Sequence, residues 1–215
     1  MNSDIRYFAI DGPESAGKTT LFNGLKAALR DTSTVFLPEI PLDLAAHYDV
    51  GTGGSEEFEV ALMSAYVERL GSISDYLMSG QIVVTDGSWL SSYAYARARK
   101  DLRPSFRFDP ELHLMQARVF ARMFPAAINV MAMLFVTVPA DVSFARLFEK
   151  LKREPEPGHS PDERWSQAVA KGFQAAIDSM RAEFPSIRVV TIDGTAGMKD
   201  VLNQALSHIC RNETR

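Results

Sequence analysis

This 215-residue chain has almost no cysteine and no long hydrophobic run. A single cysteine, Cys210, excludes an internal disulfide and a zinc site built from cysteines. The longest apolar stretch, over 128–138, is too short to cross a bilayer, and no signal-type apolar core follows a basic patch near the first residue. We therefore expect a protein of the reducing cytoplasm that has no membrane partner.

An excess of charge of one sign is also lacking. The chain has 23 Lys and Arg against 27 Asp and Glu, a net charge of −4, which argues against a broad nucleic-acid-binding surface. We expect no nucleic-acid partner. Because 46% of the residues are hydrophobic, the length suits one domain over 1–215 with a full core.

Apolar runs and helical patterns alternate along the chain. Five runs without polar alternation predict strands covered on both faces, over 6–11, 34–37, 81–86, 131–138 and 187–192. Helical patterns fill the gaps, over 18–30, 55–79, 88–100, 110–124, 140–152, 162–184 and 198–211. This alternation predicts right-handed crossovers and an α/β fold of three layers, with helices on both faces of a parallel sheet.

Residues 12–19 read Gly-Pro-Glu-Ser-Ala-Gly-Lys-Thr and match the P-loop pattern G-x-x-x-x-G-K-[ST]. The motif follows a predicted strand and opens a predicted helix, as a P-loop requires. Backbone N–H groups of such a loop surround phosphate oxygens, Lys18 reaches the outer phosphates and the Thr19 hydroxyl ligates Mg²⁺. We therefore expect ATP and Mg²⁺ as ligands. The expected nucleotide-binding residues of the loop are Gly12, Pro13, Glu14, Ser15, Ala16, Gly17, Lys18, Thr19 and Thr20.

Two acids follow predicted strands, where the ligand crevice of a parallel sheet lies. Asp86 ends the strand over 81–86, so it is a candidate catalytic acid that holds Mg²⁺ together with Thr19. Glu39 follows the second strand and is a candidate base, or hydroxyl-orienting group, for a phosphoryl acceptor. The alternative for Glu39 is an ordinary exposed loop acid.

The segment 150–163 contains three prolines and a glycine between two predicted helices, which predicts a lid. Lys150, Lys152 and Arg153 stand at its entrance, and Arg146 lies earlier on the same helix. Arg153 is the preferred catalytic cation, because only arginine offers a planar fork to phosphate. The alternative is a solvated helix end, where basic residues favour the helix dipole.

Several aromatic residues fall on the helices that border the same crevice, namely Phe58, Tyr66, Trp89, Tyr93 and Tyr95. Most aromatic residues at helical spacing belong to a core. We expect one of them to stack on a base.

Four stretches resemble thymidylate kinases. Residues 8–21 resemble the opening F-I-x-[FIL]-E-G-x-[DE]-G-A-G-K-T-T, and 80–95 resemble G-x-x-V-[IV]-x-D-R-[YFH]-x-x-S-x-x-A-Y-Q. Residues 135–146 are similar to L-D-V-x-P-E-x-A-x-x-R, and 172–193 to the closing helix and strand.

The resemblance implies a nucleotide kinase with sheet order 2-3-1-4-5, Mg·ATP as phosphoryl donor and a nucleoside monophosphate, dTMP by default, as acceptor. It further implies that Arg146 binds the nucleotide, that Glu14 contacts the acceptor's sugar and that the catalytic cations come from the lid. Members commonly form homodimers through helices, which here points to residues 58–76.

The chain departs from this family on the acceptor side. Gly87 stands where the family has the arginine of its Asp-Arg pair, and Ala96 where it has a pyrimidine-reading glutamine. A second family arginine falls near Ala65 or Tyr66, with Arg69 one turn away. Three further arginines of the helix either supply the lost charge or lie on the surface, namely Arg97, Arg99 and Arg103.

Alternatives to a monophosphate kinase therefore stay open. Residues 35–39 resemble the V-P-E-P stretch of deoxynucleoside kinases, whose Glu is a base toward a hydroxyl, so an acceptor without phosphate is a second possibility. A third is a P-loop ATPase switch without a small acceptor. A non-catalytic relative is disfavoured, because Lys18, Thr19 and Asp86 are all present.

Overall fold

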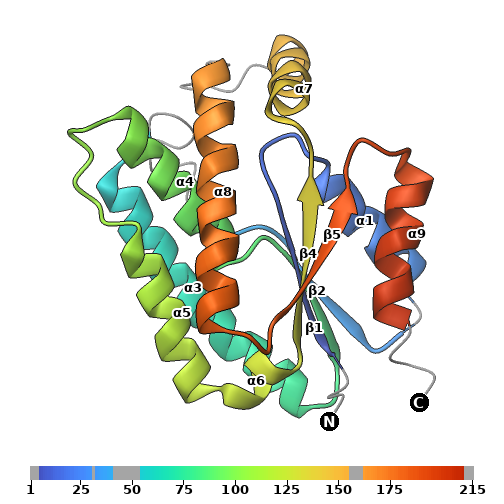
Figure 1. The fold of residues 1–215 in the computed structure, drawn as a ribbon. Helices are drawn as coiled ribbons and strands as arrows, with labels where there is room; N and C mark the ends of the chain where they lie inside the picture. Colours follow the sequence, from blue (N-terminus) through green and yellow to red (C-terminus); the bar gives the residue numbers. More distant parts are fainter. Residues whose placement is uncertain (1–4, 31, 41–53, 155–161, 211–215) are drawn as a thin grey trace.

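The computed structural model describes residues 5–30, 32–40, 54–154 and 162–210. Five parallel strands form its sheet in the order β2-β3-β1-β4-β5 (Figure 1). Their bounds are β1 Tyr7–Asp11, β2 Thr34–Leu37, β3 Ile82–Asp86, β4 Met131–Thr137 and β5 Arg188–Asp193. The predicted α/β class and strand order are confirmed.

Helices cover both faces of the sheet, as Figure 1 shows. They are α1 Lys18–Ala28, α3 Glu56–Met78, α4 Trp89–Leu102, α5 Glu111–Met123, α6 Pro125–Asn129, α7 Ala140–Arg153, α8 Glu163–Glu183 and α9 Met198–Ile209. Helices α1 and α9 pack on one face, against alternate residues such as Phe8 and Ile10 of β1. Helices α3, α4, α5 and α8 pack on the other, against Tyr7 and Ala9. The period-2 alternation of a strand thus splits the core into two layers.

The central strands β1 and β3 are buried throughout, whereas the edge strands β2 and β5 are only partly buried. The expectation of cover on both faces therefore holds for the centre of the sheet and fails at its edges. The strand predicted over 131–138 is β4, and the apolar residues just before it end the short helix α6, which has Pro125 at its first position. Proline is favoured at that position because its missing N–H has no partner there anyway.

Helices α4 and α8 pack closely, and a glycine makes this possible. A Cβ placed on Gly172 of α8 would lie 2.4 Å from the carbonyl oxygen of Ala94 in α4. The close approach brings the N-terminal half of α8 against the part of α4 that follows Ala94. The side chains of Trp165 and Tyr95 consequently stack, with ring centroids 6.1 Å apart.

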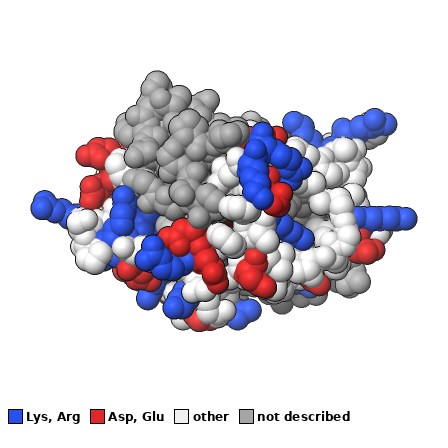
Figure 2. Space-filling model, turned by 90° about the horizontal axis from the view of Figure 1, so that it is seen from above, with Lys and Arg blue, Asp and Glu red and all other residues white. Residues whose placement is uncertain are grey.

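The face at the carboxyl ends of the strands carries both signs of charge. In Figure 2, Lys and Arg side chains are interspersed with Asp and Glu among uncharged residues. This view gives no support to a broad basic surface. Across the described ranges, no helix has the length and apolarity needed to span a membrane.

Candidate functional site

The P-loop connects β1 to α1 at the carboxyl end of the sheet. Gly17 caps α1 with φ 98°, and Ser15 also has a positive φ of 56°, so the loop curls tightly before the helix begins. Lys18 Nζ donates hydrogen bonds to the carbonyl oxygens of Gly12, at 2.8 Å, and Pro13, at 2.9 Å. The ammonium group therefore lies over the loop, where outer phosphates would lie.

A cleft of about 490 Å³ opens beside this loop. It brings together the P-loop, the end of β2, and residues of α3, α4 and α7. Its lining residues are Glu14, Ser15, Gly17, Lys18, Thr19, Thr20, Glu39, Phe58, Leu62, Tyr66, Ser91, Ser92, Tyr95, Arg99, Leu147 and Lys150. One end is thus polar and suited to phosphates, and the other is aromatic.

Asp86 ends β3 next to Thr19 and is almost fully buried. Burial raises the pKa of the Asp86 carboxyl, while the Thr19 hydroxyl and Lys18 oppose this rise. Its Oδ1 atom is buried and has no hydrogen-bond partner among the residues that the structure describes. A buried oxygen without a partner, beside a hydroxyl, fits a hard cation such as Mg²⁺.

Glu39 follows β2 and opens into the cleft. The surrounding protein raises the pKa of the Glu39 carboxyl by desolvation, and Lys18 opposes this rise most strongly. The charges of Asp86 and Asp11 raise the pKa further, and Arg69 lowers it. A carboxylate with a raised pKa near a lysine of the P-loop is suited to accept a proton.

Asp11 explains how the turn after β3 is held. Its carboxylate accepts hydrogen bonds from Ser88 N at 3.1 Å, Ser88 Oγ at 2.7 Å and Ser91 Oγ at 2.6 Å. The Ser88 hydroxyl also caps α4 by accepting from Leu90 N. Asp11 therefore fixes the start of α4 to the centre of the sheet.

Gly87 sits in this turn with φ 81°. A Cβ added there would meet only Tyr66 Oη, at 3.7 Å, so space is available. The backbone conformation, however, disfavours any residue with a side chain. An arginine at this position would thus be strained although it would not clash.

The predicted lid cations, all on α7, make different contacts. Lys150 lines the cleft, and Arg146 Nη1 donates to Gly194 O at 3.0 Å, which ties α7 to the loop after β5. Arg153 is exposed, is not among the lining residues, and donates from Nε to Glu149 O at 3.1 Å. Residues 155–161 of the predicted lid lie outside the described residues.

The aromatic candidates divide into two groups. Phe58, Tyr66 and Tyr95 line the cleft, whereas Trp89 and Tyr93 belong to the core between the sheet and the helices. An aromatic residue that the sequence did not single out, Trp165 of α8, stacks on Tyr95, and its Nε1 donates to Glu14 Oε2 at 3.0 Å. The P-loop acid is therefore held by α8.

The two arginines of α4 and the arginine that follows it lie in different surroundings. Arg97 is exposed and donates to Tyr93 Oη, and Arg103 donates to Gly54 O. Arg99 is buried and lines the cleft, so the expectation of a surface position is wrong for this residue. The spacing in the sequence could have predicted this position. Arg99 lies four residues after Tyr95 and therefore on the same face of the helix, the face that borders the cleft.

The structure also shows where two other residues of the thymidylate kinase resemblance lie. Ala96 is fully buried against Phe106 and Phe108 and does not line the cleft. Arg69 of α3 is buried, and its Nη2 donates to the carbonyl oxygens of Leu37 and Pro38. Arg69 thus supports the end of β2 from which Glu39 projects.

Comparison with known proteins shows the fold. No family model matches the chain, and no curated protein does. Among solved structures, a thymidylate kinase from Candida albicans has a TM-score of 0.64 at 17% identity, covering 98% of this chain and 93% of that one. A deoxyadenosine kinase from M. mycoides with bound dCTP has a TM-score of 0.61 at 14% identity, covering 95% and 99%. The same enzyme with dCMP and dCDP gives 0.57 at 13% identity, covering 95% and 98%.

Proposed function

We propose that this protein is an ATP-dependent phosphotransferase that transfers the γ-phosphoryl group of Mg·ATP to a nucleoside monophosphate, with dTMP as the default acceptor. The observation that carries the proposal is one cleft lined by the P-loop, Glu39 and the aromatic side chains of Phe58, Tyr66 and Tyr95, with Asp86 beside Thr19 of that loop. The fold shared with thymidylate and deoxyadenosine kinases supports it. The catalytic unit is the single domain over 1–215.

Each residue at the donor end has a distinct task. Lys18 leaves its two loop carbonyls to bind the outer phosphates, and Thr19 with Asp86 would hold Mg²⁺ or its water shell. Mg²⁺, when bound, neutralises phosphate charge. Arg146 of α7 would bind the nucleotide, and Arg153 at the end of α7 would leave its bond to Glu149 O to reach the transferring group.

At the acceptor end, Glu39 orients the attacking hydroxyl or accepts its proton, and Glu14 faces the sugar. A nucleoside acceptor is the second candidate. Gly87 offers no side chain to an acceptor phosphate, and Glu39 beside Lys18 is suited to an incoming hydroxyl. Phosphoryl transfer otherwise needs the same parts for both acceptors.

Release of ADP from Mg·ATP, measured against a panel of nucleosides and nucleoside monophosphates, tests the proposal. One class of acceptor should accelerate ADP release, and Lys18→Ala should reduce that rate by about 10²–10³-fold, because it removes a charge that stabilises the transition state. Lys171→Ala is the matched control, since this lysine is exposed on α8 and does not line the cleft.

A flat panel with slow ATP hydrolysis would favour the third possibility, an ATPase switch without a small acceptor. Turnover that survives Lys18→Ala would refute both kinase assignments, because every step depends on the phosphate cradle. Circular dichroism of the variant checks that it folds.

A homodimer through the region 58–76 is also part of the proposal. The outer face of α3 exposes Val60 and Val67 by 58% and 60%, which is unusual for valine. Sedimentation equilibrium of the wild type and of a Val67→Glu variant tests this assembly. A cytoplasmic location stays a prediction.

A further inference from the structure

Glu14 is an unusual residue for a loop that binds phosphates. It lies inside the P-loop and lines the cleft, so a negative charge stands where the expected ligand is negative too. Lys18, the cation of the loop, follows four residues later. A carboxylate that turned toward the loop would therefore repel an incoming phosphate or pair with Lys18, and either effect would weaken nucleotide binding.

Neighbouring helices hold both the backbone and the side chain of Glu14. Its carbonyl oxygen accepts a hydrogen bond from Ser143 Oγ of α7 at 2.6 Å, and Ser143 is buried. Its side-chain Oε2 accepts one from Trp165 Nε1 of α8 at 3.0 Å. Because α7 holds the backbone at this point, the hydrogen bond from α8 orients the carboxylate.

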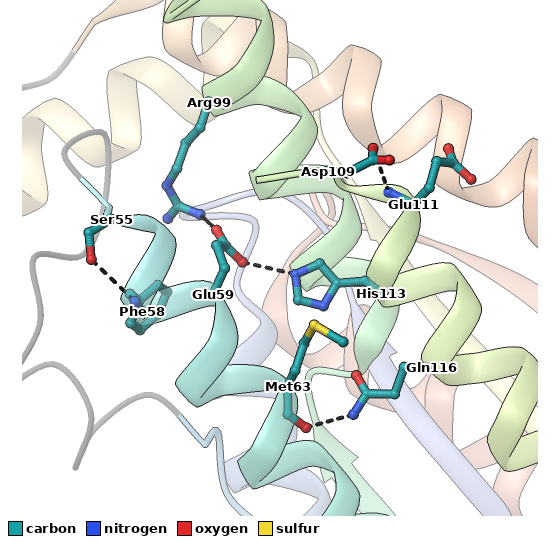
Figure 3. Close-up of polar contacts among 9 residues, drawn as sticks. All are labelled: Ser55, Phe58, Glu59, Met63, Arg99, Asp109, Glu111, His113 and Gln116. Atoms are coloured by element: carbon teal, nitrogen blue, oxygen red, sulfur yellow. Dashed lines mark hydrogen bonds and ion pairs between the residues drawn. The ribbon is translucent and has the colours of Figure 1, made fainter. Parts of the chain in front are cut away.

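The indole that donates this bond is tightly packed. Trp165 is 1% exposed, its ring stacks on that of Tyr95, and the guanidinium carbon of Arg99 lies 5.8 Å from the ring centre. Arg99 is itself anchored, since Figure 3 shows Glu59 of α3 between Arg99 of α4 and His113 of α5. The donor therefore has a fixed direction, and the glutamate is the partner whose rotatable bonds must adapt.

The hydrogen bond keeps the carboxylate near the aromatic end of the cleft. Tyr95 lines that end, and the pKa of its hydroxyl is raised, first by desolvation and next by the charge of Glu14. The carboxylate in turn gives the indole N–H an acceptor, which a buried indole needs. Both partners thus gain from the same contact.

We propose that Trp165 is a positioning residue of the nucleotide site. Its indole N–H holds the Glu14 carboxylate against α8 and thereby keeps a negative charge away from the phosphates and from Lys18. This inference rests on the proposed function, because it takes the P-loop as the phosphate site. It adds a residue that does not line the cleft and acts through Glu14.

Titration calorimetry with Mg·ATP tests this role in the wild type, in Trp165→Phe, in Glu14→Gln and in the double variant. Trp165→Phe keeps a ring against Tyr95 but removes the N–H, so the Kd of Mg·ATP should rise about tenfold. Glu14→Gln removes the charge and keeps an oxygen for the indole, so its Kd should stay within about threefold of the wild type. With the charge gone, the added Trp165→Phe change should alter the Kd by less than about threefold.

Glu14→Asp gives the same test without a change in the core. The shorter side chain keeps the charge and falls short of Trp165 Nε1, so the Kd of Mg·ATP should rise about as much as in Trp165→Phe, again about tenfold. The contrast between Glu14→Asp and Glu14→Gln therefore measures the charge alone. Circular dichroism checks that each variant folds.

Trp89→Phe is the matched control, since Trp89 is the other tryptophan of the chain. Its side chain is buried in the core and packs on Phe184, with ring centroids 5.8 Å apart. Trp89→Phe removes an indole N–H that does not bind the P-loop acid, so the Kd of Mg·ATP should keep its wild-type value.

Ionic strength gives a readout that a purely structural role would not move. If charge repulsion causes the loss, raising KCl from about 0.05 M to about 0.5 M should reduce the ratio of the Trp165→Phe and wild-type Kd values to about threefold. A loss of packing would give a ratio that salt does not change and that Glu14→Gln does not cancel. Either result would overturn the inference.

The outcomes also separate this inference from the proposed function. If Trp165→Phe and Glu14→Asp bind Mg·ATP as the wild type does, while an acceptor accelerates ADP release, the role of Trp165 is refuted and the phosphotransferase assignment remains. If Mg·ATP binding follows the predicted pattern but no acceptor accelerates ADP release, the phosphotransferase assignment fails and the role of Trp165 stands.

Discussion

At the scale of single residues, three carboxyl groups at or after the carboxyl ends of neighbouring strands have raised pKa values, namely Asp11, Glu39 and Asp86. Desolvation by the surrounding protein is the main cause of each shift, although Asp11 and Asp86 are buried and Glu39 is exposed. Asp11 is satisfied by serine donors, whereas Asp86 Oδ1 has no partner in the described part of the chain. The aspartate at the end of β1 therefore holds the fold together, and the aspartate at the end of β3 is available for a cation.

Asp86→Asn should weaken the response to Mg²⁺. The substitution keeps the shape of the side chain and removes the charge that would hold the cation or its water shell, so the Mg²⁺ concentration for half-maximal activity should rise about 10–100-fold. Titration of ADP release with Mg²⁺ at fixed ATP measures this. Asp193→Asn, at the exposed end of β5, is the control and should leave the titration unchanged. An unchanged titration for Asp86→Asn would exclude its role.

The raised pKa of Glu39 predicts a pH dependence. A base must be ionised, so kcat/KM should rise with pH around a midpoint above the ordinary range of a glutamic acid. The same raised pKa should lower the stability of the fold as pH rises, whereas it makes kcat/KM rise. The native state binds the proton more tightly than the unfolded state, so this contribution is present below the ordinary pKa and is lost as pH rises through the raised one.

A pH–rate profile of the wild type and of Glu39→Gln checks this. The variant should lose the acidic limb together with most of the activity, whereas Glu57→Gln, an exposed acid at the start of α3, should keep both. An acidic limb that survives in Glu39→Gln would assign the titration to another group.

At the scale of elements, the packing of α4 on α8 decides where the aromatic side chain of Tyr95 lies in the cleft. Tyr95 and Arg99 of α4 face Trp165 of α8 only because these two helices approach closely at Gly172. Glu59 and His113 then join α3 and α5 to the same unit. Three successive helices and the later helix α8 thus form one packed unit beside the cleft.

Gly172→Ala should therefore destabilise the protein by about 1–3 kcal/mol, because the added methyl group forces α8 away from Ala94. Urea unfolding followed by circular dichroism gives the free energy of unfolding. Gly71→Ala in α3 is the matched control: a Cβ there meets nothing within 4 Å, so the better helix propensity should stabilise by up to about 1 kcal/mol. Equal effects of the two substitutions would contradict this view of the packing.

At the scale of the whole molecule, the order of the strands assembles the site. Strands β2, β3 and β1 are neighbours, so Glu39, Asp86 and the P-loop come to one edge although long helical segments separate them in the chain. Helix α7 brings Lys150 over this edge from the other half of the sheet. Binding of a nucleotide across the edge should hence stabilise the fold as a unit.

Mg·ATP at about 100 times its dissociation constant should raise the free energy of unfolding by about 2.7 kcal/mol, because it binds only the folded state. Thermal unfolding with and without Mg·ATP measures the shift. Lys18→Ala should lose most of this shift, and Lys171→Ala should retain it. A shift that Lys18→Ala retains in full would place the nucleotide elsewhere.

The sequence alone determined the fold class, the strand order through its family resemblance, and the P-loop. These features depend on local patterns: apolar runs, helical periodicity and a fixed spacing of Gly, Lys and Thr. The two edge strands were predicted but their partial exposure was not, because burial of a strand depends on its neighbours and not on its own apolar residues. The short helix α6 was not predicted.

Only the tertiary structure decided the acceptor side. Arg97 and Arg99 look alike in sequence, yet one is exposed and the other is buried on Glu59 and held between two rings. Trp165 reaches Glu14 from a helix at the other end of the chain. Such contacts join residues from separate helices whose relative placement follows from packing, and no local pattern carries that information.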